Sequence, residues 1–195
     1  MRRAVSVLTF LSLILACATL PPVKNSQIAE SNLPPEYRIE GVQPVKQNYN
    51  GCVPACAEMV LKFYGKDLDK GLIAKWIQRA YGTNPEDLVQ LVTSHGFNAY
   101  RFSDWQSSKK RIKYFLCQGY PVLVGGKFGF RTEGHMIVLV GYDDRKKMVR
   151  EGKEFEGVFF ACDPSPGKMV EIRYEVFLEF HKGRDSYGIV IYPKS

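Results

Sequence analysis

The stretch from residue 47 to residue 65 places a cysteine at the start of a predicted helix. Asn50-Gly51 is a turn dipeptide, and Pro54 suits the first turn of a helix. A helix N-terminus carries unpaired backbone N–H groups and a positive partial charge, which stabilise the thiolate form of cysteine that attacks carbonyl carbons. Cys52 is therefore a candidate nucleophile. The alternative is a buried structural cysteine on an apolar helix, and this stretch alone does not separate the two.

Gln47 lies shortly before this cysteine. Attack on a carbonyl places negative charge on its oxygen, and preorganised N–H donors stabilise that charge. The side-chain amide of Gln47 and the backbone N–H of Cys52 would together form such an oxyanion hole.

A nucleophilic thiol also needs a base, and the chain has 3 histidines. His95 falls at the end of a predicted helix, where histidine commonly interacts with the last carbonyl groups. His181 lies among charged residues and is expected on the surface. His135 begins an apolar strand directly after Gly134, so it is the candidate general base. A hydrogen-bonded core histidine is the alternative.

Asp163 follows the next predicted strand. A carboxylate at that place could hold the imidazole of His135 in the required tautomer and stabilise its charged form. Asp163 could equally start a Pro-Gly-rich turn, as Asp143-Asp144 is expected to do after the strand of His135. The order cysteine, histidine, aspartate along the chain favours the catalytic interpretation.

Helices precede strands along the chain, which predicts an α+β domain in which the helical half faces the sheet. Predicted helices cover residues 52–65, 69–81, 84–96 and 104–119, and predicted strands cover residues 98–102, 120–125, 135–142, 157–161 and 187–192. Residues 175–181 fit either a helix or a strand. In this arrangement Cys52 on the helical half can face His135 and Asp163 on the sheet.

Four pieces of the sequence together resemble the papain-like cysteine peptidases of the bacteriocin-leader-processing type, often called double-glycine peptidases. They are Gln47, the run Cys52-Val53-Pro54-Ala55-Cys56, residues 134–142 and the run Cys162-Asp163-Pro164. The resemblance spans residues 45–192. It implies a papain-like fold, with N-terminal helices packed on a C-terminal antiparallel sheet, and a peptidase that needs no cofactor.

The resemblance also implies a role for each site residue. Cys52 would be the nucleophile, His135 the general base and then acid, Asp163 the orienting group and Gln47 part of the oxyanion hole. Val53 departs from the family, which has glycine after the nucleophile. Two alternatives therefore stay open: a catalytically impaired module that binds peptides, and an acyl transferase that uses the same site.

The N-terminus has the features of an export signal, with a basic start and an apolar run that ends in Ala16-Cys17. Residues 14–17 resemble a bacterial lipobox, which would make Cys17 the lipidated first residue of the mature protein. An ordinary signal cleaved nearby is the alternative. We predict a signal at residues 1–16, a tether at 17–43 and a peptidase domain at 44–195, exported to the cell envelope and anchored to a bacterial membrane. Removal of leader peptides during secretion is not implied, because no transporter segment accompanies the signal.

Composition narrows the partners. The 27 basic and 20 acidic residues give a net charge of +7, and the basic residues are scattered except at 109–111 and 145–147. This pattern favours solvated faces over a nucleic-acid surface, so we predict a peptide or protein substrate and no nucleic acid. Cys52 and Cys56 have helical spacing, but no second Cys/His pair is near in the sequence, so no metal site is predicted.

Overall fold

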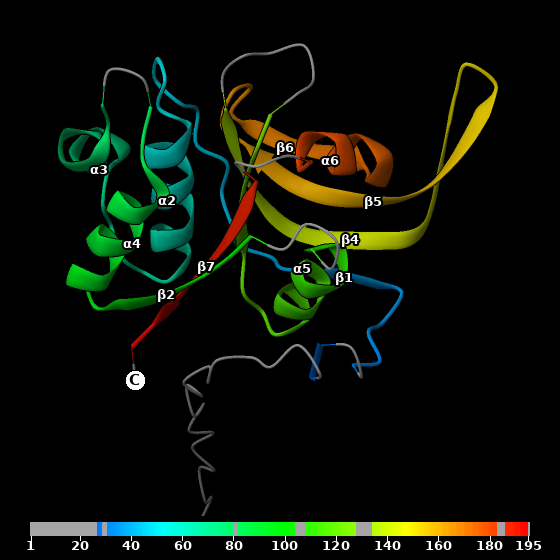
Figure 1. The fold of residues 1–195 in the computed structure, drawn as a ribbon, viewed down its shortest axis with the longest axis horizontal. Coiled ribbons are helices and arrows are strands. Elements are labelled where there is room, and N and C mark those ends of the chain that lie inside the picture. Colours follow the sequence, from blue (N-terminus) through cyan, green and yellow to red (C-terminus); the bar gives the residue numbers. More distant parts are fainter. Residues whose placement is uncertain are drawn as a thin grey trace, which may run out of the picture.

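The computed structural model describes residues 27–28, 31–79, 82–103, 108–127, 134–182 and 186–194. Helices pack on a 7-stranded antiparallel sheet with the strand order β2-β7-β3-β4-β5-β6, and β1 pairs with β4 (Figure 1). The helices are α2 (Cys52–Phe63), α3 (Lys70–Ile77), α4 (Pro85–Ser94), α5 (Ser108–Cys117) and α6 (Tyr174–Phe180). The strands are β1 (Glu36–Arg38), β2 (Phe97–Phe102), β3 (Val122–Gly126), β4 (His135–Arg150), β5 (Lys153–Asp163), β6 (Lys168–Arg173) and β7 (Tyr187–Pro193). The predicted α+β architecture is confirmed.

Local capping signals explain where the helices begin. The side chain of Asp69 accepts a hydrogen bond from Gly71 N at the start of α3, and that of Asn84 accepts one from Glu86 N at the start of α4. The start of α2 differs, because its capping residue is Gly51 and no side chain of the described residues caps it. The first N–H groups of α2 therefore face no competing side-chain acceptor at the cap.

The sheet is longer than the sequence predicted. Asp143 and Asp144, expected in a turn, lie within β4 at an irregularity in its pairing with β5. The two strands continue as a hairpin that extends from the body of the sheet (Figure 1) and turns at Glu151 and Gly152, both with positive φ. The strand β6 was not predicted, because its six residues, KMVEIR, neither alternate strictly between apolar and polar nor form a continuous apolar run. Residues 175–181, left undecided, form most of α6.

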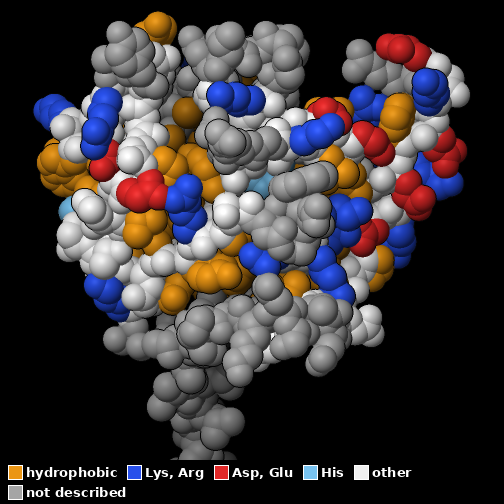
Figure 2. Space-filling model, viewed as in Figure 1, with side chains coloured by type: hydrophobic (Ala, Val, Ile, Leu, Met, Phe, Trp, Pro, Cys, Tyr) orange, Lys and Arg blue, Asp and Glu red, His pale blue; other side chains and the backbone are white. Residues whose placement is uncertain are grey.

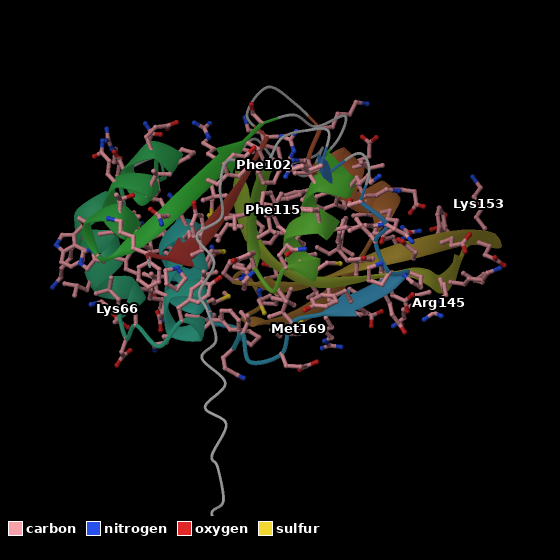
Figure 3. All side chains as sticks on the ribbon, turned by 90° about the horizontal axis from the view of Figure 1, so that it is seen from below. Lys66, Phe102, Phe115, Arg145, Lys153 and Met169 are labelled. Atoms are coloured by element: carbon pink, nitrogen blue, oxygen red, sulfur yellow. The ribbon has the colours of Figure 1, made fainter. Side chains whose placement is uncertain are left out.

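One continuous core joins the helices to the sheet. In α2 the buried face includes Cys56, Met59 and Val60, and α2 packs on β4. Figure 3 shows Phe102 of β2 next to Phe115 of α5, and their ring centroids are 6.0 Å apart. The start of α2 is thus fixed against the strand that carries His135.

The segment that directly precedes residue 44, residues 34–42, is part of the domain. Glu36–Arg38 pair with β4 at Gly141–Asp143, Ile39 N donates to Val140 O at 2.7 Å, and Val42 is buried. The prediction of a tether is therefore wrong for its last residues. The prolines in this stretch suggested an extended linker, although its apolar side chains pack on the sheet. Residues 1–26, with the predicted signal and Cys17, lie outside the described residues.

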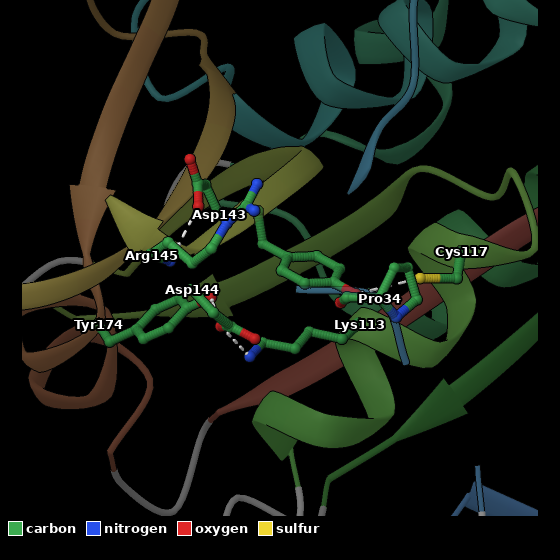
Figure 4. A network of polar contacts seen from close by, with 8 residues as sticks. Pro34, Lys113, Cys117, Asp143, Asp144, Arg145 and Tyr174 are labelled. Atoms are coloured by element: carbon green, nitrogen blue, oxygen red, sulfur yellow. Dashed lines mark hydrogen bonds and ion pairs between the residues drawn. The ribbon is translucent and has the colours of Figure 1, made fainter. Parts of the chain in front are cut away.

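A polar network holds this segment near α5 (Figure 4). The buried Tyr142 donates from its hydroxyl to Pro34 O at 2.7 Å. Asp144 Oδ1 accepts a hydrogen bond from the Tyr174 hydroxyl at 2.6 Å and forms an ion pair with Lys113 Nζ. Burial lowers the pKa of Lys113, while Asp144 acts in the opposite direction.

The hairpin carries charged side chains of both signs, and Figure 2 shows acidic and basic groups intermixed on this face. The cations at 145–147 all take part in ion pairs: Arg145 with Glu36, Lys146 with Glu171 and Lys147 with Glu154. Lys153 lies near the tip, at the opposite end of the molecule from Lys66 (Figure 3). Within the described part of the chain, no helix is long and apolar enough to cross a membrane.

Candidate active site

Cys52 is the first residue of α2 and is half-buried. The turn before it is tight, with Asn50 at a φ of 52° and Gly51 N donating to Asn48 O at 3.0 Å. A Cβ on Gly51 would lie 3.1 Å from Asn48 O, which leaves little room for a larger residue. The predicted placement of this thiol at a helix N-terminus is confirmed.

His135 and Asp163 come from adjacent strands. His135 is the first residue of β4 and Asp163 is the last residue of β5, so antiparallel pairing brings them to the same end of the sheet. His135 Nε2 bonds to Asp163 Oδ1 at 2.8 Å. The same oxygen accepts a hydrogen bond from Ser165 N at 2.8 Å. Asp163 therefore occupies both of the positions considered from the sequence, since it starts a turn and also forms a hydrogen bond to the imidazole of His135.

The imidazole also interacts with the thiol of Cys52, across the boundary between helix and sheet. Burial acts to lower the pKa of His135, but the hydrogen bonds and negative charges of Asp163 and Cys52 outweigh it and raise the pKa to about 9. Because Nε2 is bonded to Asp163, the nitrogen left for the thiol is Nδ1. An imidazole with this pKa is protonated at neutral pH and stabilises a thiolate beside it.

Gln47 lies at the same corner of the molecule. Its backbone N donates to Pro164 O at 2.8 Å, directly after Asp163. Its side-chain Oε1 is buried and has no hydrogen-bond partner among the described residues. The structure thus gathers all four predicted site residues around the start of α2 and the adjacent ends of β4 and β5.

A model of the Peptidase_C39 like family matches residues 39–185. The chain belongs to this family. The membership confirms the resemblance predicted from the sequence and makes the chain a cysteine peptidase. No curated protein sequence matches the chain.

Solved peptidase domains of this kind have the same fold. The peptidase domain of Streptococcus ComA, a bi-functional ABC transporter involved in a quorum sensing pathway, is 18% identical, with a TM-score of 0.60 over 79% of this chain and 100% of that one. A double glycine motif protease from an AMS/PCAT transporter, in complex with the leader peptide, is 17% identical, with a TM-score of 0.57 over 81% of this chain and 95% of that one. At these identities the likeness establishes the papain-like fold.

The other cysteines of this C39-like peptidase have structural surroundings. Cys56 is fully buried, and its thiol donates to Met136 O at 3.3 Å, next to His135. Burial, with smaller effects from Cys52, Asp163 and Cys162, raises the pKa of Cys56 well above its ordinary value. Burial likewise raises the pKa of Cys162 to about 11. The cysteines in the described part of the chain form no disulfide, and no group of His, Cys, Asp or Glu there could hold a metal ion.

The two remaining histidines of the peptidase lie elsewhere. His95 bonds from Nδ1 to Leu91 O at 2.8 Å, as predicted for a residue at a helix end. The prediction that His181 lies on the surface is wrong. His181 is 1% exposed, bonds to Gly125 O at 3.0 Å and stacks on Phe177 at 5.4 Å. Its charged neighbours in the sequence concealed its position at the end of α6, whose apolar side packs on the sheet.

Tyr187 is a site neighbour that the sequence analysis missed. Burial, with smaller effects from Cys52 and Cys56, raises the pKa of its hydroxyl. Its ring lies over Gly125, where a Cβ would be 2.6 Å from the ring. The Gly125-Gly126 pair at the end of β3 was the available signal, because glycine in a strand often marks a close approach.

Val53, the departure from the family pattern, is a core residue in this peptidase. Its side chain is buried and belongs to the apolar cluster that joins α2 to the sheet. The extra side chain is therefore accommodated by packing in the interior.

Proposed function

We propose that this peptidase is exported and that it cleaves peptide bonds through a thiolate on Cys52, with His135 and Asp163 as its acid–base pair. The observation that carries the proposal is the hydrogen bond of 2.8 Å between His135 Nε2 and Asp163 Oδ1, at the ends of β4 and β5, with the thiol of Cys52 interacting with the same imidazole. This interaction with the thiol supports catalysis over the alternative of an impaired binding module.

The reaction follows from these positions. The thiolate of Cys52 attacks the substrate carbonyl and forms a C–S bond, and the oxyanion accepts hydrogen bonds from the Gln47 amide and a backbone N–H at the start of α2. His135 gives its Nδ1 proton to the departing amine as the C–N bond breaks. Water then attacks the acyl-enzyme, His135 takes its proton, and the acid product leaves Cys52.

A peptide is the proposed substrate class. The similar double glycine motif protease is described in complex with its leader peptide, which supports a peptide here as well. Peptides with a Gly-Gly pair before the cleaved bond are therefore the first substrates to test. The lipid anchor remains a proposal that rests on the sequence around Cys17, and Cys17→Ser is expected to abolish incorporation of labelled fatty acid.

Alkylation by iodoacetamide at about pH 5.5, where ordinary thiols are slow, tests the thiolate. We expect Cys52 to be modified far faster than Cys117, a half-buried thiol of the same chain that serves as the internal control. His135→Ala should remove this difference. Equal rates at Cys52 and Cys117 in the unaltered protein would contradict the proposal.

Turnover of Gly-Gly peptides tests the reaction class. Hydrolysis that disappears in Cys52→Ala supports a peptidase. Transfer of the acyl group to an added amine in preference to water would instead identify an acyl transferase. Tight peptide binding without turnover, in a protein whose Cys52 is not activated, would identify a binding module.

A further inference from the structure

The turn between β5 and β6, residues 164–167, contacts two parts of the site. It folds back on Asp163, because Ser165 N donates to the Asp163 side chain at 2.8 Å and Gly167 N donates to Asp163 O at 3.0 Å. Ser165, at the start of the turn, therefore holds the carboxylate, whereas Gly167, at its end, is bonded only to the backbone of Asp163.

The other side of the turn faces the segment that carries Gln47. Pro164 O accepts the backbone N–H of Gln47 at 2.8 Å. Gly167 has a φ of 68° and lies against Lys46, so that a Cβ there would be 2.7 Å from Lys46 Cβ and 3.1 Å from Lys46 Cα. Real Cβ atoms do not approach this closely, and the obstacle includes backbone, so the segment would have to move.

Besides Pro164, Gln47 is supported through its neighbours, since Val45 packs against the core and Tyr49 O accepts a hydrogen bond from Gln78 Nε2 at 3.0 Å. Gln47 lies in a stretch without helix or strand, between the buried Val42 and the turn before Cys52. Its Oε1 makes no hydrogen bond within the described part of the chain. The place of its backbone therefore decides where its amide lies.

We propose that the end of this turn, at Gly167, is a positioning device for Gln47, while the start of the turn, at Ser165, separately holds the carboxylate of the acid–base pair. The inference rests on the proposed function. Gly167 is its key residue, because only a residue without a side chain leaves room for Lys46 and keeps Gln47 in place. A small displacement of an oxyanion donor is costly, because stabilisation of the transition state depends on its geometry.

Gly167→Ala tests the device, with Gly152→Ala as its matched control. Both glycines have similar positive φ, 68° and 73°, so alanine strains the backbone equally at each. A Cβ at Gly152 meets nothing within 4 Å, whereas a Cβ at Gly167 meets Lys46. Gly167→Asn is a second variant, since asparagine tolerates positive φ but still carries the Cβ.

With Gly-Gly peptides we expect kcat to fall by about 10-fold or more in both Gly167 variants, with KM within about twofold. The alkylation rate of Cys52 and its pH profile should match those of the Gly152→Ala protein. The backbone and side-chain amide signals of Gln47 in ¹⁵N NMR spectra should move in the Gly167 variants and stay in place in Gly152→Ala.

Unchanged Gln47 signals, or a kcat equal to that of Gly152→Ala, would overturn the positioning role while leaving the proposed function intact. If the unaltered protein has no activated Cys52, the proposed function fails, and the NMR comparison still decides whether the turn positions Gln47. A loss of Cys52 alkylation in Gly167→Ala would also overturn the proposal, because it would show a general disturbance of the site.

Discussion

His135 Nε2 and Asp163 Oδ1 lie 2.8 Å apart at the adjoining ends of two antiparallel strands. The carboxylate can only accept, so Nε2 carries a proton and Nδ1 faces the thiol of Cys52. This tautomer is the one that lets the imidazole exchange a proton with the reacting groups, and several consequences can be measured.

Asp163→Asn should lower the pH at which activity is lost on the alkaline side. The pKa of His135 is raised to about 9, so its imidazolium is present below that pH and disappears as the pH rises through it. Asparagine removes the negative charge, and the pKa should move toward the ordinary value. The pH profile of kcat/KM should show its alkaline limb near 9 in the unaltered protein and at lower pH in the variant, with activity reduced by about 10²- to 10⁴-fold. An alkaline limb that stays in place would contradict the assignment to His135.

Gln47→Ala should reduce kcat by about 10²- to 10³-fold, since it removes an oxyanion donor. Alkylation of Cys52 forms no oxyanion, so its rate should stay unchanged. Gln43→Ala is the control, because Gln43 is exposed and lies in the same segment. Equal kcat values in the two variants would exclude Gln47 from the oxyanion hole.

His181→Gln should make the protein less sensitive to acid. Burial lowers the pKa of His181 below its unfolded value, so the unfolded chain binds more protons, and the contribution of this residue to stability is lost as the pH falls below about 6.5. Glutamine can keep a donor to Gly125 O without titrating. The difference in melting temperature between neutral pH and about pH 5 should therefore shrink in the variant. An unchanged difference would mean that other groups cause the acid sensitivity.

Tyr142→Phe should loosen the segment before β1. The change leaves Pro34 O without the buried hydroxyl that donates to it at 2.7 Å. Because Pro34 is exposed and water can replace the donor, the loss of this hydrogen bond costs about 0.5–1.5 kcal/mol in the free energy of unfolding. Urea denaturation measures the loss, and limited proteolysis should find new cleavage near Pro34. Tyr49→Phe is the control, because Tyr49 is 86% exposed. An equal decrease in the free energy of unfolding in Tyr49→Phe would contradict the role of the Tyr142 hydroxyl.

Local signals allowed much of this site to be predicted from the sequence. The turn before Cys52 and the cap at Asn84 are set by residues close in the chain, and the structure has both helices where these signals place them. His135 and Asp163 could be predicted because each stands at the end of a recognisable strand. Their pairing needs only that the two strands be antiparallel neighbours.

Features that depend on distant partners were missed. The burial of His181 depends on Gly125, and the strand β1 exists because β4 offers it hydrogen bonds. The support of Gln47 by Pro164 joins segments far apart in the sequence. No local pattern carries such contacts, because only the folded sheet brings their partners together.

The strand β1 has one more consequence, for the solubility of shortened chains. β3 pairs with β4 through Leu139, and β1 takes over at Gly141, where the absence of a side chain lets Tyr37 O approach. Without β1, the N–H and C=O groups of β4 from Gly141 to Asp143 would form an open sheet edge, which is a template for pairing with other chains. A chain that begins at residue 44 is therefore expected to aggregate, because it lacks the strand β1 that covers this edge of β4 and prevents self-association.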